Sequence, residues 1–106
     1  MNEYIVRQAD KFKMSALEDE KYNYKVSRGD TNYCFIADYK YYKDKALILA
    51  DNLNEVFEIG NDENIENNKS IKIRFDYLYS ISVGDIIIDK TNGVKYVVQP
   101  IGFAEL

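Results

Sequence analysis

The dipeptide Asn92-Gly93 constrains the fold more strongly than any other feature of the sequence. It lies between two short runs rich in β-branched residues, Ile86–Asp89 (IIID) and Val94–Val98 (VKYVV). Asn-Gly favours tight hairpin turns because both residues tolerate positive φ, and β-branched side chains favour strands. The sequence therefore predicts an antiparallel β-hairpin, and Pro100 is expected to end its second strand because proline cannot donate to the ladder.

Three segments before this hairpin are also periodic. Residues 71–79 alternate apolar and polar side chains, which predicts a long half-buried strand, and the wholly apolar run Ala46–Ala50 predicts a central one. Residues 61–70 are polar and are expected to form an exposed loop. Residues 52–60 have helical periodicity, which predicts an amphipathic helix whose buried face comprises Leu53, Val56, Phe57 and Gly60.

The front of the chain carries weaker patterns. Alternation at Tyr22–Val26 predicts a half-buried strand, and Tyr33–Ala37 predicts a second one. The cluster Arg28–Asn32 between them contains turn-forming residues, so the two are expected to form another hairpin. Asp38–Lys45 is then interpreted as a polar connection rich in tyrosine.

The beginning of the chain completes the expected architecture. Tyr4–Arg7 predicts a short opening strand, and residues 9–20 predict a charged loop or one or two helical turns. We therefore expect one globular α+β domain spanning residues 1–106, with a mainly antiparallel sheet of six or seven short strands and the helix at about 52–60 packed on it. The alternative is a small SH3-like or OB-like β-barrel.

The sequence contains no histidine, and this absence excludes much catalytic chemistry. Without imidazole there is no Ser-His-Asp or Cys-His machinery and no mixed thiolate and imidazole zinc site. Asp85 and Asp89 would stand about 13 Å apart on a strand, too far for a glycosidase pair. The segment Ser82–Asp85 (SVGD) has one glycine and no following Gly-Lys-Ser/Thr, so it is not a nucleotide cradle. We expect no enzyme, no cofactor and no metal site.

Charge and targeting signals limit the partners and the compartment. The formal charge of −4 disfavours a general binder of the nucleic-acid phosphate backbone, because such affinity comes from clustered lysine and arginine, so nucleic acid is not the expected partner. Apolar runs stay well below the roughly 18 residues that a membrane helix needs, and the N-terminus lacks the apolar core of a signal peptide. The expectation is a cytoplasmic protein, in which the lone Cys34 is a buried structural thiol.

Two groups of residues are candidates for binding a partner. Tyr39, Tyr41 and Tyr42 cannot all point inward from a polar connection, and exposed tyrosines are frequent in protein interfaces. Interleaved Lys40, Lys43 and Lys45 allow the alternative that this segment stacks on single-stranded nucleic acid. The second group is acidic and lies on the predicted helix and the loop after it, where it offers a negatively charged surface: Glu55, Glu58, Asp62, Glu63 and Glu66.

The second half of the chain also carries several motifs in a characteristic order. These are Ala50–Asn61 (ADNLNEVFEIGN), Tyr79–Ile86 (YSISVGDI), Tyr96–Val98 (YVV) and Gly102–Leu106 (GFAEL). In this order, residues 46–106 resemble the small YodL-like proteins of phages, plasmids and integrated elements. That family has no established enzymatic activity or cofactor, so the resemblance implies a mobile-element origin.

These observations lead to one expected function and two alternatives. The expected function is a non-enzymatic mobile-element protein that binds and modulates a host or phage protein, including the case of an anti-CRISPR or anti-restriction inhibitor. One alternative is a nucleic-acid-associated module that uses the Tyr/Lys segment 39–45. The other is a structural or assembly component.

Overall fold

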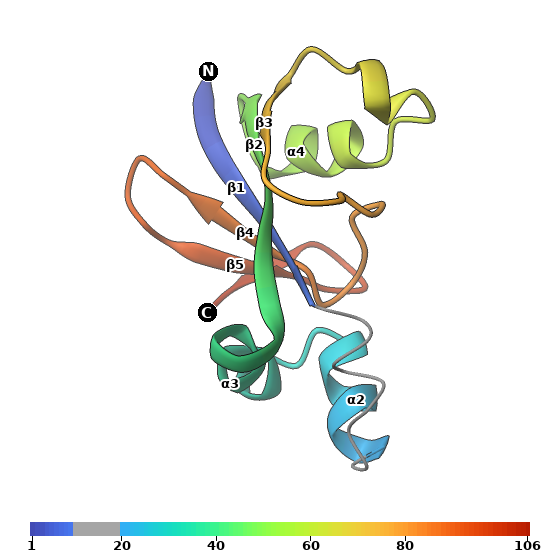
Figure 1. The fold of residues 1–106 in the computed structure, drawn as a ribbon. Helices are drawn as coiled ribbons and strands as arrows, with labels where there is room; N and C mark the ends of the chain where they lie inside the picture. The colour runs from blue at the N-terminus through green and yellow to red at the C-terminus, as the bar shows by residue number, and fades with distance from the viewer. Residues whose placement is uncertain (10–19) are drawn as a thin grey trace.

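The computed structural model describes residues 1–9 and 20–106. The described residues contain a six-stranded, fully antiparallel sheet whose strands follow the order β3-β2-β1-β4-β5-β6 (Figure 1). The strands are β1 (Asn2–Ala9), β2 (Tyr42–Ala50), β3 (Ile71–Arg74), β4 (Ile86–Asp89), β5 (Lys95–Val98) and β6 (Phe103–Glu105). The α+β class is confirmed, and the sheet is open rather than closed into a barrel.

The rear hairpin and the amphipathic helix agree with the sequence. Strands β4 and β5 pair around a turn in which Gly93 adopts φ +75° and donates to the Asp89 carbonyl at 2.7 Å. Helix α4 (Leu53–Gly60) begins after Asn52, whose side chain accepts the Glu55 amide at 2.9 Å. Residues 61–70 form the predicted loop, which contains a short 3-10 turn, η1 (Ile65–Asn67).

One prediction for α4 is wrong. Phe57 is 37% exposed, whereas its neighbour Val56 is fully buried and Ile59 is nearly so. The buried face is therefore centred on Val56 and Ile59. Gly60 belongs to it, because a Cβ there would approach Ile81 Cδ1 to 2.2 Å, so any other residue would require the Ile81 side chain to move.

The predicted front hairpin is also wrong, because both of its strands are helical. Helix α2 (Glu20–Ser27) ends before Gly29, which has φ +74°, and the Asp30 amide closes this end by donating to the Lys25 carbonyl at 3.1 Å. Asp30 then caps α3 (Thr31–Tyr41) by accepting the amides of Asn32 and Tyr33. These two local signals outweigh the strand propensity of tyrosine and valine.

Two further boundaries differ from the prediction. The expected polar connection at 38–45 is divided between the last turn of α3 and the start of β2. The expected strand at 71–79 leaves the sheet after Arg74, where the amides of Phe75 and Asp76 both donate to the Lys45 carbonyl and the ladder ends. Leu78 and Ile81 are buried instead of the alternating aromatic residues. The charged loop or helical turns expected at 9–20 fall almost wholly outside the described residues.

Two clusters of buried residues lie on opposite faces of the sheet. The larger is beneath α4 and includes Val6, Ile48 and Val98, whereas the smaller joins Cys34 and Ala37 of α3 to Val97. Since Val97 and Val98 are adjacent on β5, their side chains point to opposite faces. Figure 1 shows α4 beside one part of the sheet and α2 with α3 at its other end.

The segment Ser80–Asp85 is the turn that leads into β4. Gly84 adopts φ +94°, and a Cβ at this position would lie 2.4 Å from the Val26 carbonyl oxygen. Asp85 accepts the Ser82 amide at 2.9 Å. Glycine is therefore required here both by its backbone angle and by the close approach of α2.

Candidate functional site

Four aliphatic side chains form a row across four neighbouring strands. Ile73 of β3 pairs with Leu47 of β2, Leu47 pairs with Ile5 of β1, and Ile5 pairs with Ile88 of β4. Their chain neighbours Val6, Ile48 and Ile87 belong to the cluster beneath α4. Because side chains alternate along a strand, this aliphatic row lies on the face opposite α4.

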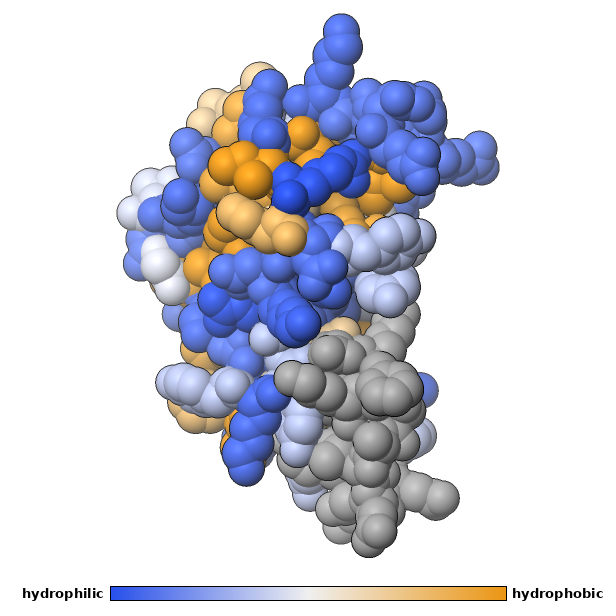
Figure 2. Space-filling view, viewed as in Figure 1, coloured by the Kyte–Doolittle hydropathy of each residue, from blue (hydrophilic) through white to orange (hydrophobic). Residues whose placement is uncertain are grey.

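The aliphatic row belongs to neither buried cluster. Ile73 is 48% exposed, Ile5 and Ile88 are half-buried, and only the inner member Leu47 is buried, at 6%. No helix of the described residues covers the row, since α4 packs on the other face and α3 on the adjoining part of this one. Figure 2 shows apolar side chains reaching the surface among hydrophilic ones in the part of the molecule that contains the sheet.

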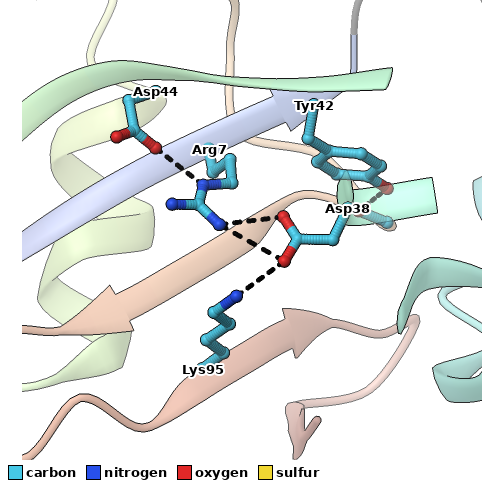
Figure 3. A network of polar contacts seen from close by, with 6 residues as sticks. Arg7, Asp38, Tyr42, Asp44 and Lys95 are labelled. Atoms are coloured by element: carbon cyan, nitrogen blue, oxygen red, sulfur yellow. Dashed lines mark hydrogen bonds and ion pairs between the residues drawn. The ribbon is translucent and has the colours of Figure 1, made fainter. Parts of the chain in front are cut away.

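A network of charged side chains borders the row on the side of α3 (Figure 3). The Asp38 carboxylate of α3 accepts from Arg7 Nη1 at 3.0 and 3.2 Å and from Lys95 Nζ at 2.8 Å. Arg7 Nε also donates to Asp44 at 2.6 Å. Arg7 is two residues beyond Ile5 on β1, and Lys95 pairs with Ile88. The network therefore separates the aliphatic row from the part of the same face that α3 covers.

The positive and negative side chains of this network compensate one another through ion pairs and hydrogen bonds. Burial lowers the pKa of the Arg7 guanidinium, but hydrogen bonds and charge interactions with Asp44 and Asp38 outweigh burial and raise it. Asp38 is almost completely buried, so its carboxylate depends on Arg7 and Lys95 to replace water. The arrangement ties α3 to β1 and β5, and we assign it a structural role.

The structure separates the three tyrosines predicted to bind a partner. Tyr39 is 77% exposed, contacts the Phe35 ring edge-on at 6.0 Å and lies beneath Lys95 Nζ at 5.8 Å. Tyr41 and Tyr42 are half-buried against the smaller cluster, and the Tyr42 hydroxyl donates to the Gly84 carbonyl at 2.5 Å. Only Tyr39 is presented to solvent as a large surface.

The lysines of this segment are separated as well. Lys40 and Lys43 are exposed, but Lys45 is buried. The Lys45 ammonium lies 3.6 Å from Asp76 and 5.4 Å from the centre of the Tyr79 ring. Lysines and tyrosines 39–45 therefore do not form one continuous stripe of alternating rings and cations.

The predicted acidic residues lie on and after α4. Glu58, Asp62, Glu63 and Glu66 are exposed and Glu55 is half-buried. Hydrogen bonds from the Asn64 amide and the Asn68 side chain lower the pKa of Asp62. Since α4 covers the face opposite the aliphatic row, these acids form a separate surface.

Among the described residues, Cys34 and the acidic side chains are the remaining candidates for a nucleophile or a metal site. Cys34 is fully buried, which confirms the prediction of a buried cysteine. Burial raises the pKa of its thiol to about 11 and also raises the pKa of the neighbouring Tyr42 hydroxyl. Among the residues that the structure describes, no three acidic or cysteine side chains are placed to hold a metal ion. No helix in the same part of the chain has the length and apolar character needed to cross a bilayer.

One open cavity lies near β3. It has a volume of about 330 Å³ and is lined by Ile65, Glu66, Arg74, Asp76, Tyr77 and Leu78. The Arg74 guanidinium donates to the Ile65 carbonyl across it. Glu66 and Asp76 place two negative charges in the lining beside the positive charge of Arg74.

Sequence reasoning missed the aliphatic row because it assigned each of these residues to a separate strand, without a prediction of which strands pair or of their register. A signal was present in Ala46–Ala50, which is apolar on both faces although only one helix was predicted to cover the sheet.

Comparison with known proteins finds no matching family model and no similar curated protein or solved structure.

Proposed function

We propose that this chain is a non-enzymatic protein that binds and modulates a host protein, and that the aliphatic row is the centre of its contact surface. The observation that carries the proposal is the pairing of Ile73, Leu47, Ile5 and Ile88 in one row that neither α3 nor α4 covers. Burial of apolar surface stabilises a complex by roughly 25 cal/mol per Å², and contiguous apolar patches on a protein surface mark interaction sites.

The charges around the row fit an interface with another protein. Arg7 and Asp44 lie on one side of the row, and Glu3 and Lys90 pair at 3.5 Å on another. Because each cation of these two pairs lies beside an anion, the pairs add no excess positive charge that would attract a nucleic acid. An apolar centre with a mixed polar rim is the usual anatomy of a protein–protein contact.

The resemblance of residues 46–106 to YodL-like proteins of mobile elements supports a host protein as the partner. A phage or plasmid gains from inhibiting the defence of its host, so we propose a CRISPR or restriction component as the class of target. The chain would act by steric blockade, with the aliphatic row covering a functional surface of the partner.

Phage plating tests this function. Host cells with an active CRISPR or restriction system would express the wild-type chain, Ile73→Asp, or the control Ile101→Asp, whose parent residue is 93% exposed on the turn between β5 and β6. We expect wild type and Ile101→Asp to raise plaque numbers at least tenfold and Ile73→Asp to raise them less than twofold. No rise with wild type on either kind of host would overturn defence inhibition, and an equal rise with Ile73→Asp would overturn the assignment of the row.

A further inference from the structure

Strand β3 lies at the edge of the sheet, next to the outer end of the aliphatic row. Its only partner strand among the described residues is β2. We propose that the free edge of β3 is a strand-addition site for an extended segment of the partner protein in which apolar and acidic residues alternate. This inference rests on the proposed function and names the chemistry of the partner.

The direction of the backbone groups supports strand addition. Ile73 pairs with Leu47 of β2, and the Phe75 amide donates to the Lys45 carbonyl of β2 at 2.9 Å. In an antiparallel ladder, alternate residues direct both their amide and their carbonyl toward the same neighbouring strand. Arg74, between two residues turned toward β2, therefore directs its backbone groups away from the sheet, where an added strand would meet them.

The aliphatic row predicts the apolar half of the pattern. A strand added to β3 would place one residue opposite Ile73 on the face that carries the row. An apolar side chain at this position extends the row from four strands to five and covers Ile73, the most exposed of its members. The next residue on each side of it points to the other face.

The charge of the edge predicts the acidic half. Lys69, Lys72 and Arg74 lie within six residues of one another in a chain whose net charge is −4. Lys69 and Lys72 are exposed, and the described residues provide neither with an ion pair. Glu66 and Asp76 line the cavity beside Arg74, but the carboxylate of Asp76 already lies 3.6 Å from Lys45. The excess positive charge along the edge favours acidic side chains on the incoming strand.

The same charges disfavour a second copy of this chain as the occupant. If two β3 strands paired antiparallel with Ile73 opposite Ile73, Lys72 of each copy would lie opposite Arg74 of the other. Like charges directly opposite one another destabilise a strand pair. Lysine on an exposed edge is a common means of preventing self-pairing, and it leaves the edge available to a partner of opposite charge.

A peptide titration followed by NMR tests the proposal. The ¹⁵N-labelled chain would be titrated with an eight-residue peptide of alternating valine and glutamate, and separately with one of alternating valine and lysine. We expect saturating amide shifts at residues 71–75 with the glutamate peptide and at least tenfold weaker binding of the lysine peptide. N-methylation of every second peptide amide should abolish binding, because strand addition needs those donors.

Two charge variants provide the matched comparison. Lys72→Glu should weaken binding of the glutamate peptide at least fivefold, and Lys40→Glu, which makes the same charge change on α3, should alter it less than twofold. Strand addition would be overturned by equal binding of both peptides or by amide shifts centred away from β3. It would also be overturned by full binding of the N-methylated peptide or by a concentration-dependent dimer through β3. If the peptide does not bind but the plaque effect still depends on Ile73, strand addition is overturned and the proposed function stands. If the peptide binds but the wild-type chain has no plaque effect, the proposed function is overturned and strand addition stands.

Discussion

Gln8 of β1 and Asp85 of the Ser80–Asp85 turn form a buried hydrogen bond across 77 residues of sequence, with Nε2 of Gln8 3.0 Å from Oδ2 of Asp85. The same amide group donates to the Tyr79 carbonyl, and its oxygen accepts the Tyr79 amide at 3.0 Å. The Gln8 side chain thus makes with the Tyr79 backbone the two hydrogen bonds that a neighbouring strand would make, although the segment that contains Tyr79 is no longer part of the sheet. This contact fixes the turn that the sequence predicts but cannot position.

Removal of this side-chain amide is expected to destabilise the fold. Gln8→Leu should lower the free energy of unfolding by about 2–4 kcal/mol, because Tyr79 loses two partly buried hydrogen bonds and Asp85 loses a buried one. The same change at Gln99, which donates one partly buried hydrogen bond to the Gly29 carbonyl, should cost about 1 kcal/mol. Urea denaturation measures both, and equal losses would contradict the role given to Gln8.

The two acids bound to Arg7 are expected to differ in their contribution to stability. Asp38→Ala should cost about 3 kcal/mol, because it leaves Arg7 and Lys95 partly buried without their shared carboxylate. Asp44→Ala should cost less than about 1 kcal/mol, because Asp44 is largely exposed and solvent screens its charge. Denaturation at low and at high salt measures the two costs, and a larger loss for Asp44→Ala would contradict the network as described.

Adjacent residues of α4 provide a test of the corrected helix face. Val56→Asp should prevent folding, because it places a charge without a partner beneath the helix. Phe57→Asp should leave a folded protein that loses no more than about 1–2 kcal/mol, because this ring lies at the margin of the core. Circular dichroism and thermal melting distinguish the outcomes. If Phe57→Asp unfolds and Val56→Asp does not, the buried helix face that periodicity predicts, with Phe57 in it, is correct.

Cys34 is expected to be inert in the folded protein. With its pKa raised to about 11, the thiol is ionised about 100-fold less at pH 8 than a thiol of pKa 9, and burial further slows its reaction. A maleimide should therefore label it rapidly only after denaturation. Ile101→Cys in a Cys34→Ala background supplies an exposed control, and labelling of native Cys34 at the rate of this control would contradict its burial.

The same pKa shift predicts a pH dependence of stability. Between pH 9 and about 11 the thiol of the unfolded chain releases its proton while the folded thiol keeps it, so the unfolded state binds fewer protons. The stability that Cys34 contributes is thus fully present below pH 9 and declines as the pH rises toward 11. Comparison with Cys34→Ala isolates this effect from the titration of tyrosine and lysine, and parallel pH profiles would contradict it.

The parts of the fold that the sequence predicted correctly have local causes. Asn92-Gly93 defines the rear hairpin within a few residues, and α4 combines helical periodicity with a capping residue, Asn52. In the front half, Gly29 and Asp30 carry equally local signals for ending one helix and beginning the next. Tyrosine and valine around them favour strands, so the sequence pattern predicts a strand turn, but in the structure the two local signals outweigh that preference.

The candidate site could not be predicted in the same way. The openness of the aliphatic row depends on where α3 and α4 pack, and neither position follows from the periodicity of β1, β2 or β4. The alternation at 71–79 likewise does not reveal that the ladder stops at Arg74 and leaves Ile73 near the surface. The aromatic residues after it are exposed because Leu78 and Ile81 occupy the core in their place.

The most direct test of the central claim is site-specific photo-cross-linking in the plating host. A benzophenone side chain would replace Ile73 in one variant and the exposed Ile101 in another, and mass spectrometry would identify the adducts. We predict one predominant adduct to a host defence protein from position 73 and none to that protein from position 101. Absence of an adduct at position 73, equal adducts from both positions, or an adduct to a second copy of this chain would contradict the aliphatic row as the binding surface for a host protein.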